Sequence, residues 1–358
     1  MQRLKSEICK KLEQERGITI QSANISLAFN YEGKDYLINL IDTPGHVDFG
    51  GHVTRAMRAV DGIVLVIDAV EGVMPQTETV LRQAMKERAK PTVFVNKVDR
   101  LIKELKLTPE QMQERLIKII TGVNKFIDRY GPKEFKEDWK IGVEKGNICF
   151  GSAFLKWAVS ITSMKKSNIG FKDIIELCAA GKDAELVEKS PIDEVMLGMV
   201  IKHLPNPLIA QKYRIPVIWK GDEESEEGKA MINCDPNAKT IGVAFGVVND
   251  PHAGEVALVR LFSGKVSKGK ELFLASKLKN EKVQQIGIYM AKDRIMTEEV
   301  IAGNIVGIVG LKDVYVGETV SEGRIEPFEQ IKHYSEPVIT KSIEAKDSKD
   351  LAKLIQAL

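Results

Sequence analysis

The first half of the chain alternates between short apolar runs and longer segments with a helical hydrophobic period. Residues 62–68 (GIVLVID) and 91–95 (PTVFV) are apolar runs of strand length. Residues 76–88 and 110–128 instead place apolar side chains three and four positions apart, which predicts amphipathic helices. Strands without polar alternation are buried on both faces, so the pattern predicts a parallel sheet covered by helices, an α/β fold.

Shorter segments complete this predicted domain. Residues 24–29 and 36–41 alternate in strand fashion around the turn Tyr31-Glu32-Gly33-Lys34, which predicts a β-hairpin. The remaining expected elements are a helix over residues 1–15, a strand over 149–152, and helices over 171–178 and 191–203.

The pattern changes after the segment Pro205-Asn206-Pro207. From about residue 215 to residue 329 the chain has short strand-like runs and frequent glycines, as in GVAFGVV and GNIVGIVGL, which predicts a closed β-barrel. Residues 337–358 begin a third, α+β unit and end before it can bury a core. We therefore expect a first domain over residues 1–212 with an insertion at about 101–148, a β-barrel over 213–335, and the start of a third domain over 336–358.

Composition mainly excludes classes of protein. With 44% hydrophobic and 28% charged residues the chain is typical of ordinary soluble proteins, and its net charge of +2 gives no argument for nucleic acid. Cys9, Cys149, Cys178 and Cys234 are scattered, which disfavours zinc and suits a reducing cytoplasm. No apolar run is long enough to span a bilayer, so a cytoplasmic protein without membrane contact is expected.

The first candidate for chemistry is Asp42-Thr43-Pro44-Gly45-His46, directly after the second hairpin strand. A carboxylate at the end of a buried strand can hold Mg²⁺ through water, as Asp42 would. Gly45 can bring its backbone N–H close to a terminal phosphate, and His46 follows on a loop from which it can reach an attacking water. The alternative is a plain strand–turn–helix junction punctuated by Pro and Gly.

The second candidate is Asn96-Lys97-Val98-Asp99, which follows the strand PTVFV. N-K-x-D is a pattern that reads guanine: the Asp99 carboxylate would accept from the ring N–H and the exocyclic amine, while Asn96 and Lys97 hold the loop and the base plane. Adenine presents an acceptor where guanine has a donor, so the carboxylate repels it. Each motif alone is weak, but DTPGH and NKVD at the ends of two apolar strands together favour a GTP- or GDP-binding site with Mg²⁺.

With Arg16-Gly17-Ile18-Thr19-Ile20 upstream of the hairpin, these motifs resemble the translational GTPases. The resemblance implies that Thr19 ligates Mg²⁺ and senses the γ-phosphate, and that Ile18 forms one side of an apolar gate around His46. It also implies that Ser152 and Ala153, in a Gly-Ser-Ala segment, contact the guanine oxygen through their backbone. RGITI alone would otherwise be a loop entering a strand.

Longer stretches narrow the resemblance to the archaeal-type elongation factors that drive translocation, including HLPNPLIAQKYRIP and DPHAGEVALVRLFSGKVSKGKEL. The implied activity is ribosome-stimulated GTP hydrolysis that promotes movement of tRNA and mRNA. The implied partners are the ribosome, through large-subunit RNA and stalk proteins, and tRNA and mRNA indirectly, with a monomeric protein. The alternatives are another ribosomal GTPase, of the elongation factor G or ribosome-protection type, and a non-catalytic fragment.

One departure from that family is the phosphate-binding loop G-x-x-x-x-G-K-[ST], which is expected upstream of RGITI and does not occur there. The near match over residues 264–271 ends in Glu271, which offers no hydroxyl for Mg²⁺, and we interpret it as a barrel hairpin. The sequence thus resembles a fragment without the phosphate-binding loop, its preceding strand and the C-terminal domains. The chain alone is therefore expected not to be competent for GTP hydrolysis.

Overall fold

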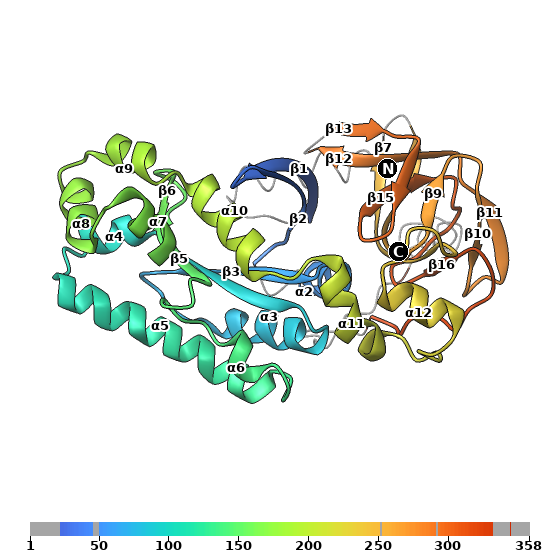
Figure 1. Cartoon of the computed structure of the whole chain (residues 1–358), viewed down its shortest axis with the longest axis horizontal. Helices are drawn as coiled ribbons and strands as arrows, with labels where there is room; N and C mark the ends of the chain where they lie inside the picture. Colours follow the sequence, from blue (N-terminus) through green and yellow to red (C-terminus); the bar gives the residue numbers. More distant parts are fainter. Residues whose placement is uncertain (1–21, 46–49, 251–252, 291–292, 332–343, 345–358) are drawn as a thin grey trace.

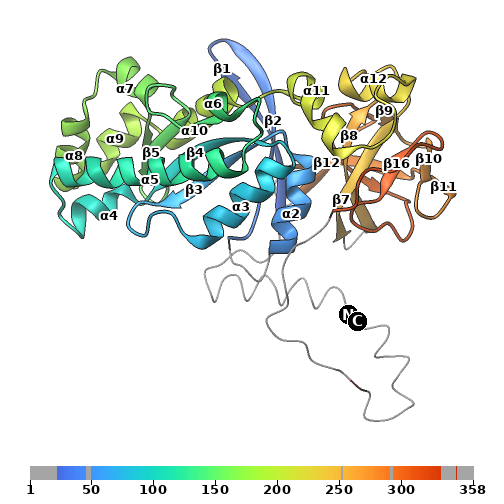
Figure 2. The same cartoon turned by 90° about the horizontal axis from the view of Figure 1, so that it is seen from below.

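The structure, a computed structural model, describes residues 22–45, 50–250, 253–290, 293–331 and 344. Within these segments an α/β body occupies one end of the molecule and a β-rich body the other, with α11 (Pro207–Ile218) between them (Figures 1 and 2). The expected helix over residues 1–15, the candidates Ile18, Thr19 and His46, and nearly all of the expected third unit lie outside the described residues.

The α/β body is built on a four-stranded sheet with the order β3-β4-β5-β6. Strands β3 (Gly62–Asp68), β4 (Lys90–Asn96) and β5 (Ile148–Ser152) run parallel, and β6 (Trp157–Val159) is antiparallel to β5. The predicted parallel arrangement of the apolar runs is confirmed. The antiparallel edge strand β6 was not foreseen.

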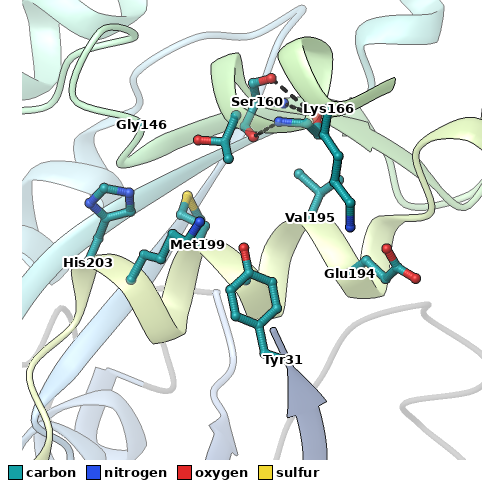
Figure 3. Close-up of a pocket in the computed structure, with 12 residues that line it drawn as sticks. Tyr31, Gly146, Ser160, Lys166, Glu194, Val195, Met199 and His203 are labelled. Atoms are coloured by element: carbon teal, nitrogen blue, oxygen red, sulfur yellow. Dashed lines mark hydrogen bonds between the residues drawn. The ribbon is translucent and has the colours of Figure 1, made fainter. Parts of the chain in front are cut away.

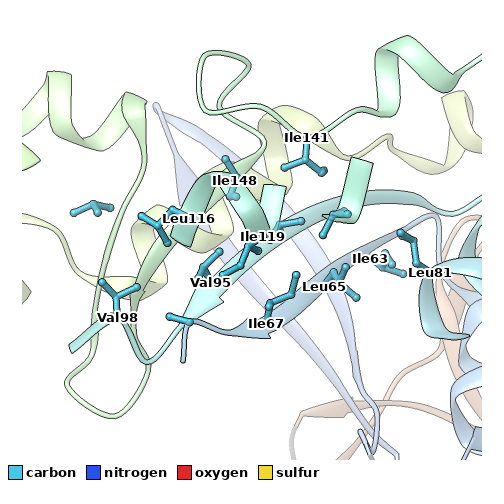
Figure 4. Close-up of a cluster of buried hydrophobic side chains, with 14 of the residues drawn as sticks. Ile63, Leu65, Ile67, Leu81, Val95, Val98, Leu116, Ile119, Ile141 and Ile148 are labelled. Atoms are coloured by element: carbon cyan, nitrogen blue, oxygen red, sulfur yellow. The ribbon is translucent and has the colours of Figure 1, made fainter. Parts of the chain in front are cut away.

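Helices cover both faces of this sheet. On one face α5 (Pro109–Tyr130) and α3 (Pro75–Lys86) pack against alternate strand residues such as Leu65 and Val95 (Figure 4). On the other face α10 (Ile192–His203) contacts Phe94 and Cys149. The other helices are α2 (Gly50–Ala59), α4 (Val98–Lys103), α6 (Lys136–Trp139), α7 (Ile161–Ser167), α8 (Phe171–Ala179), α9 (Asp183–Lys189) and α12 (Glu226–Ile232).

Helix α5 shows why the hydrophobic period was a reliable guide. It begins with a capping box, in which Thr108 accepts from the Gln111 amide and Gln111 accepts from the Thr108 amide, and Pro109 takes the first helical position. Its buried side chains recur every three or four residues and are Met112, Leu116, Ile119, Val123 and Ile127. Ile120 is partly buried against the same core.

The predicted hairpin is confirmed as a separate two-stranded sheet of β1 (Ala23–Tyr31) and β2 (Lys34–Asp42). Its two turn residues, Glu32 and Gly33, both have positive φ, as the tight turn between twisted strands requires. At the tip Tyr31 lies against α10, where a Cβ on Gly198 would meet the Tyr31 ring at 2.7 Å (Figure 3). Lys202 of α10 adds an ion pair of 2.8 Å to Glu32, so the tip is anchored.

Among the described residues, the hairpin and β3 belong to different sheets, and β3 pairs only with β4. The Val66 side chain on this edge strand is 58% exposed. The expected absence of the phosphate-binding loop and its strand concerns residues before Ser22 and lies outside the described segments.

The β-rich body is an eight-stranded sheet with the order β11-β10-β16-β7-β8-β15-β12-β13, joined by the two-stranded β14-β9. Its strands are β7 (Ile241–Asp250), β8 (Gly254–Ser263), β9 (Lys265–Ser267), β10 (Glu271–Leu274), β11 (Lys279–Lys282), β12 (Gln285–Met290), β13 (Asp293–Met296), β14 (Glu299–Ile301), β15 (Ile305–Val309) and β16 (Thr319–Ser321).

The prediction of a closed barrel is wrong for the described residues, because the end strands β11 and β13 do not pair with each other. Strand β11 is KNEK, and charged residues on an end strand are a common means of keeping an edge unpaired. The near match to a phosphate-binding loop, residues 264–271, contains β9 and the turn into β10. It is not a hairpin, since β9 pairs with β14 and β10 pairs with β11 and β16.

The strand-like region begins later than predicted. Residue 215 lies in α11, α12 follows, and the first strand of the second body starts at Ile241. Both helices have N-caps that the hydrophobic pattern alone did not reveal: Asn206 accepts from the Ile209 amide at 3.0 Å, and Ser225 accepts from the Gly228 amide at 3.0 Å. None of the helices in the described segments is long and apolar enough to cross a membrane.

We expect Cys149 and Cys178 to resist alkylation in the folded protein. Both thiols are fully buried, and burial raises the pKa of each to about 12. At pH 8 such a thiol is about 10⁻⁴ ionised, against about a quarter for an ordinary cysteine. Mass spectrometry after iodoacetamide treatment should find both unlabelled in buffer and labelled in denaturant. Rapid labelling in buffer would show that β5 or α8 opens readily.

Candidate functional site

The carboxyl ends of three neighbouring strands define the candidate site. Because β3, β4 and β5 are parallel, their last residues, Asp68, Asn96 and Ser152, meet at one edge of the sheet. The strand register places Asp68 directly opposite Asn96 and Val95 opposite Phe150. This edge is where open α/β sheets bind their ligands.

Asn96 links the two loops that the sequence singled out separately. Its side-chain oxygen Oδ1 accepts a hydrogen bond from the Lys97 amide at 2.8 Å and another from the Ala153 amide at 2.9 Å. The first bond fixes the turn into α4, and the second holds the Gly-Ser-Ala loop beside it. The structure therefore brings Asn96, Lys97 and Ala153 together although 57 residues separate Asn96 from Ala153.

Lys97 has a strained backbone and a specific partner. It caps α4 in the left-handed region, with φ 63° and ψ 31°, where a non-glycine residue is uncommon. Its Nζ forms an ion pair of 2.7 Å with Asp68 Oδ2, and its side chain is half exposed. The aliphatic part of the Lys97 side chain is thus held across the carboxyl ends of β3 and β4, where a planar ring could pack against it.

Asp68 was missed by sequence reasoning. Its Oδ1 accepts from the Val70 amide at 2.7 Å, while Oδ2 holds Lys97. Partial burial would raise the pKa of the carboxyl, but the hydrogen bonds from Lys97 and from the Val70 and Glu71 amides outweigh burial and lower this pKa. Asp68 therefore stays charged at neutral pH. Its place as the last residue of the buried run GIVLVID was the available signal.

Asp99 and Ser152 complete the guanine candidates. Asp99 lies in the first turn of α4, directly after the buried Val98 that anchors the helix, and is partly exposed. The Ser152 hydroxyl is fully buried and accepts from the Leu155 amide at 3.2 Å, so it shapes the loop. Ala153, one residue on, is exposed at the rim.

The phosphate-end candidates lie on a different element. Asp42 is the exposed last residue of β2, and Gly45 follows three residues later. A Cβ built on Gly45 would meet no heavy atom within 4 Å, so its backbone is open to a close approach. The described segments contain no cluster of three or more Asp, Glu, His or Cys side chains that could hold a metal ion by themselves. A single exposed carboxylate still fits Mg²⁺, which commonly takes one or two carboxylates together with phosphate oxygens.

We expect Asn96→Ala to loosen the loop at Ala153. The substitution leaves two amides without their acceptor, which costs about 1–3 kcal/mol of unfolding free energy. Hydrogen exchange should rise at Lys97 and Ala153 and stay unchanged in β7. Asn30→Ala is a matched control, because Asn30 donates to Asp35 at 2.7 Å in the exposed hairpin tip. Equal effects of both variants would contradict the bridging role of Asn96.

Comparison with known proteins defines the class to which this site belongs. Residues 8–206 match the family of the elongation factor Tu GTP binding domain, and residues 254–321 match elongation factor Tu domain 2. Because the first match covers more than half of the chain, the chain belongs to the elongation factor Tu GTP-binding domain family. Its α/β body is accordingly the GTP-binding domain of that family and its β-rich body is the second domain.

Among curated proteins, the chain is similar to archaeal proteins named elongation factor 2. It is 60% identical over 346 residues to the one from Thermococcus kodakarensis, covering 97% of this chain and 47% of that protein. It is 58% identical to those from Pyrococcus abyssi and Methanocaldococcus jannaschii, over 97% of this chain and 47% and 48% of theirs. The chain therefore spans about half the length of these relatives.

Proposed function

We propose that this chain is the nucleotide-binding half of an elongation factor 2 that hydrolyses GTP on the ribosome to promote translocation of tRNA and mRNA. The observation that carries the proposal is the joining of the NKVD and Gly-Ser-Ala loops through Asn96 at the carboxyl edge of the sheet. The similarity to archaeal elongation factor 2 over 97% of the chain supports the choice within the family. The domain limits 1–212, 213–335 and 336–358 are part of the proposal.

Helix α4 and the loop after β5 carry the residues that select guanine. Asp99, at the first turn of α4, is the acceptor for the ring N–H and the exocyclic amine of guanine. Lys97, braced by Asp68, supplies a flat stem beside the base. The Ala153 amide is the backbone donor for the guanine oxygen. Because this amide donates to Asn96 Oδ1 in the structure, its hydrogen bond would be shared between Asn96 and the guanine oxygen when the base is bound.

The hairpin, the segment before it and the loop after it carry the residues proposed to bind Mg²⁺ and the phosphates. Thr19 and Asp42 are proposed to hold Mg²⁺, and the open backbone of Gly45 is proposed to approach the γ-phosphate. When bound, Mg²⁺ offsets the negative charge that the phosphate oxygens carry during hydrolysis. His46 is proposed to orient the attacking water, and the ribosome is proposed to press it into place. GTP or GDP is the proposed nucleotide.

Translocation itself is the test that separates this function from its rivals. The useful protein is a chimaera in which this chain replaces the 346 matched residues of the Thermococcus kodakarensis relative. Added with GTP to archaeal ribosomes stalled before translocation, it should move the toeprint by one codon. GTP hydrolysis without movement would instead favour another ribosomal GTPase, such as a ribosome-protection protein. Absence of both would favour a non-catalytic chain.

A further inference from the structure

The C-terminus of α2 is capped by two arginines from outside the helix. The last carbonyls of any α-helix lack partners within the helix. Here Arg214 of α11 donates to the Met57 and Arg58 carbonyl oxygens at 3.1 Å each. Arg260 of β8, in the second domain, donates to the Ala59 carbonyl oxygen at 3.2 Å. The helix is thus held in part by Arg260, a residue of another domain that lies 201 positions beyond Ala59 in the chain.

These arginines belong to a buried cluster of charges. The Asp61 carboxylate forms ion pairs with Arg260 at 2.8 Å and with Arg214 at 3.1 Å. Arg58 donates two hydrogen bonds to the Glu87 carboxylate, at 2.6 and 3.0 Å. The three guanidinium groups are at most 3% exposed. Three cations face two carboxylates, and the negative end of the α2 dipole offsets the excess positive charge. The cap is therefore electrostatically matched to this helix end.

The second domain also holds the strand on the other side of the DTPGH loop. Ile41, next to last in β2, packs with Ala59 against Phe245, Leu258 and Ile305 of the second domain. Two residues earlier Asn39 donates to Asn304 Oδ1 at 3.3 Å. Residues 43–49 thus connect two elements, β2 and α2, that both rest on the same neighbouring domain.

We propose that Arg260 and Arg214 are positioning residues for GTP hydrolysis: by capping α2 they let the second domain set the position of this helix, which follows the DTPGH segment in the chain. Neither arginine touches the nucleotide site. Their effect passes along α2, a helix of ten residues with one end in the cluster and the other end following the loop directly. The inference rests on the proposed function for its consequence in turnover, and on the hydrogen bonds above for its physical basis.

The first arm of the test uses this chain and needs no activity. Arg260→Met removes the charge and the cap but keeps most of the apolar stem, and hydrogen exchange should rise at least tenfold across the hydrogen-bonded amides of α2, residues 54–59. Lys265→Met is the matched control, since Lys265 forms a surface ion pair with Glu299 at 2.9 Å in the same domain. If Arg260→Met does not fold, Arg260→Lys replaces it. A smaller rise in hydrogen exchange is then expected, because lysine keeps the charge but lacks the planar guanidinium that donates to two acceptors at once.

The second arm uses the Thermococcus chimaera and separates kcat from KM. Arg260→Met should lower ribosome-stimulated kcat at least tenfold while KM for GTP stays within threefold. Val266→Ala, in the core of the second domain, controls for lost stability alone and should leave kcat unchanged. Unchanged exchange in α2, or raised exchange with normal kcat, would overturn the proposal. A wild-type chimaera without stimulated turnover would contradict the proposed function. The hydrogen-exchange result would still show whether Arg260 stabilises α2.

Discussion

His46→Ala is expected to reduce ribosome-stimulated GTP turnover by roughly 10²–10⁴-fold, the usual effect of losing a positioned proton-transfer or water-orienting group. GTP affinity should stay within a few-fold, because Gly45, and not the imidazole, is proposed to meet the γ-phosphate. Turnover and equilibrium binding would both be measured on the chimaera with the Thermococcus kodakarensis relative. Turnover should fall while GTP affinity is kept, since a loss of both would indicate that His46 serves binding.

His52→Ala is the matched control for this variant. His52 lies six residues further on, in α2, and is partly buried. Burial, and then the charge of Arg55, lower the pKa of His52, and this residue is not among those proposed for the chemistry. It should show near-normal turnover. Near-normal turnover of His46→Ala as well would remove His46 from the site.

Asp99→Asn is expected to change which base the site accepts. The carboxylate is proposed to accept two hydrogen bonds from guanine, and an amide presents a donor in place of one acceptor. The loss should be about 3 kcal/mol or more, that is, at least about a hundredfold in GDP affinity. Xanthine carries an oxygen where guanine carries the amine, so xanthosine diphosphate should bind the variant better than the wild type.

Fluorescent-nucleotide competition on the chimaera would measure this change. Asp138→Asn is the control for lost charge, because Asp138 forms an exposed ion pair of 2.7 Å with Lys90. That variant should retain the preference for guanine. If Asp99→Asn kept full GDP affinity, α4 would not be the element that reads the base.

Much of the site could be predicted from sequence because it depends on local pattern. Residues 62–68 and 91–95 are apolar runs, and parallel pairing of such runs brings their ends together. The structure also brings Asn96 and Ala153 together, which the strand pattern alone did not predict. The hairpin followed from strand alternation around a turn in which Gly33 takes a positive φ. Thr19 and His46 remain predictions, since they lie outside the residues that the structure describes.

The features that sequence could not supply depend on long-range contacts or on strand ends. The pair of Lys97 with Asp68 requires the register of β3 and β4 to be known. Arg260 meets Asp61 across 199 residues, and no periodicity marks either side chain as a partner of the other. The open sheet likewise depends on which end strands pair, a property that short strands and glycines do not encode. The end of α11 and all of α12 lie in a region that was assigned to strands, although Asn206 and Ser225 are ordinary N-caps.

The most direct test of the central claim is the rate at which the chimaera hydrolyses GTP and ATP, each with and without archaeal ribosomes. A guanine-specific GTPase that works on the ribosome should hydrolyse GTP slowly alone, accelerate by several orders of magnitude when ribosomes are added, and leave ATP essentially untouched in both conditions. Equal hydrolysis of GTP and ATP would contradict base selection at Asp99. GTP hydrolysis that ribosomes do not accelerate would contradict the assignment to translation.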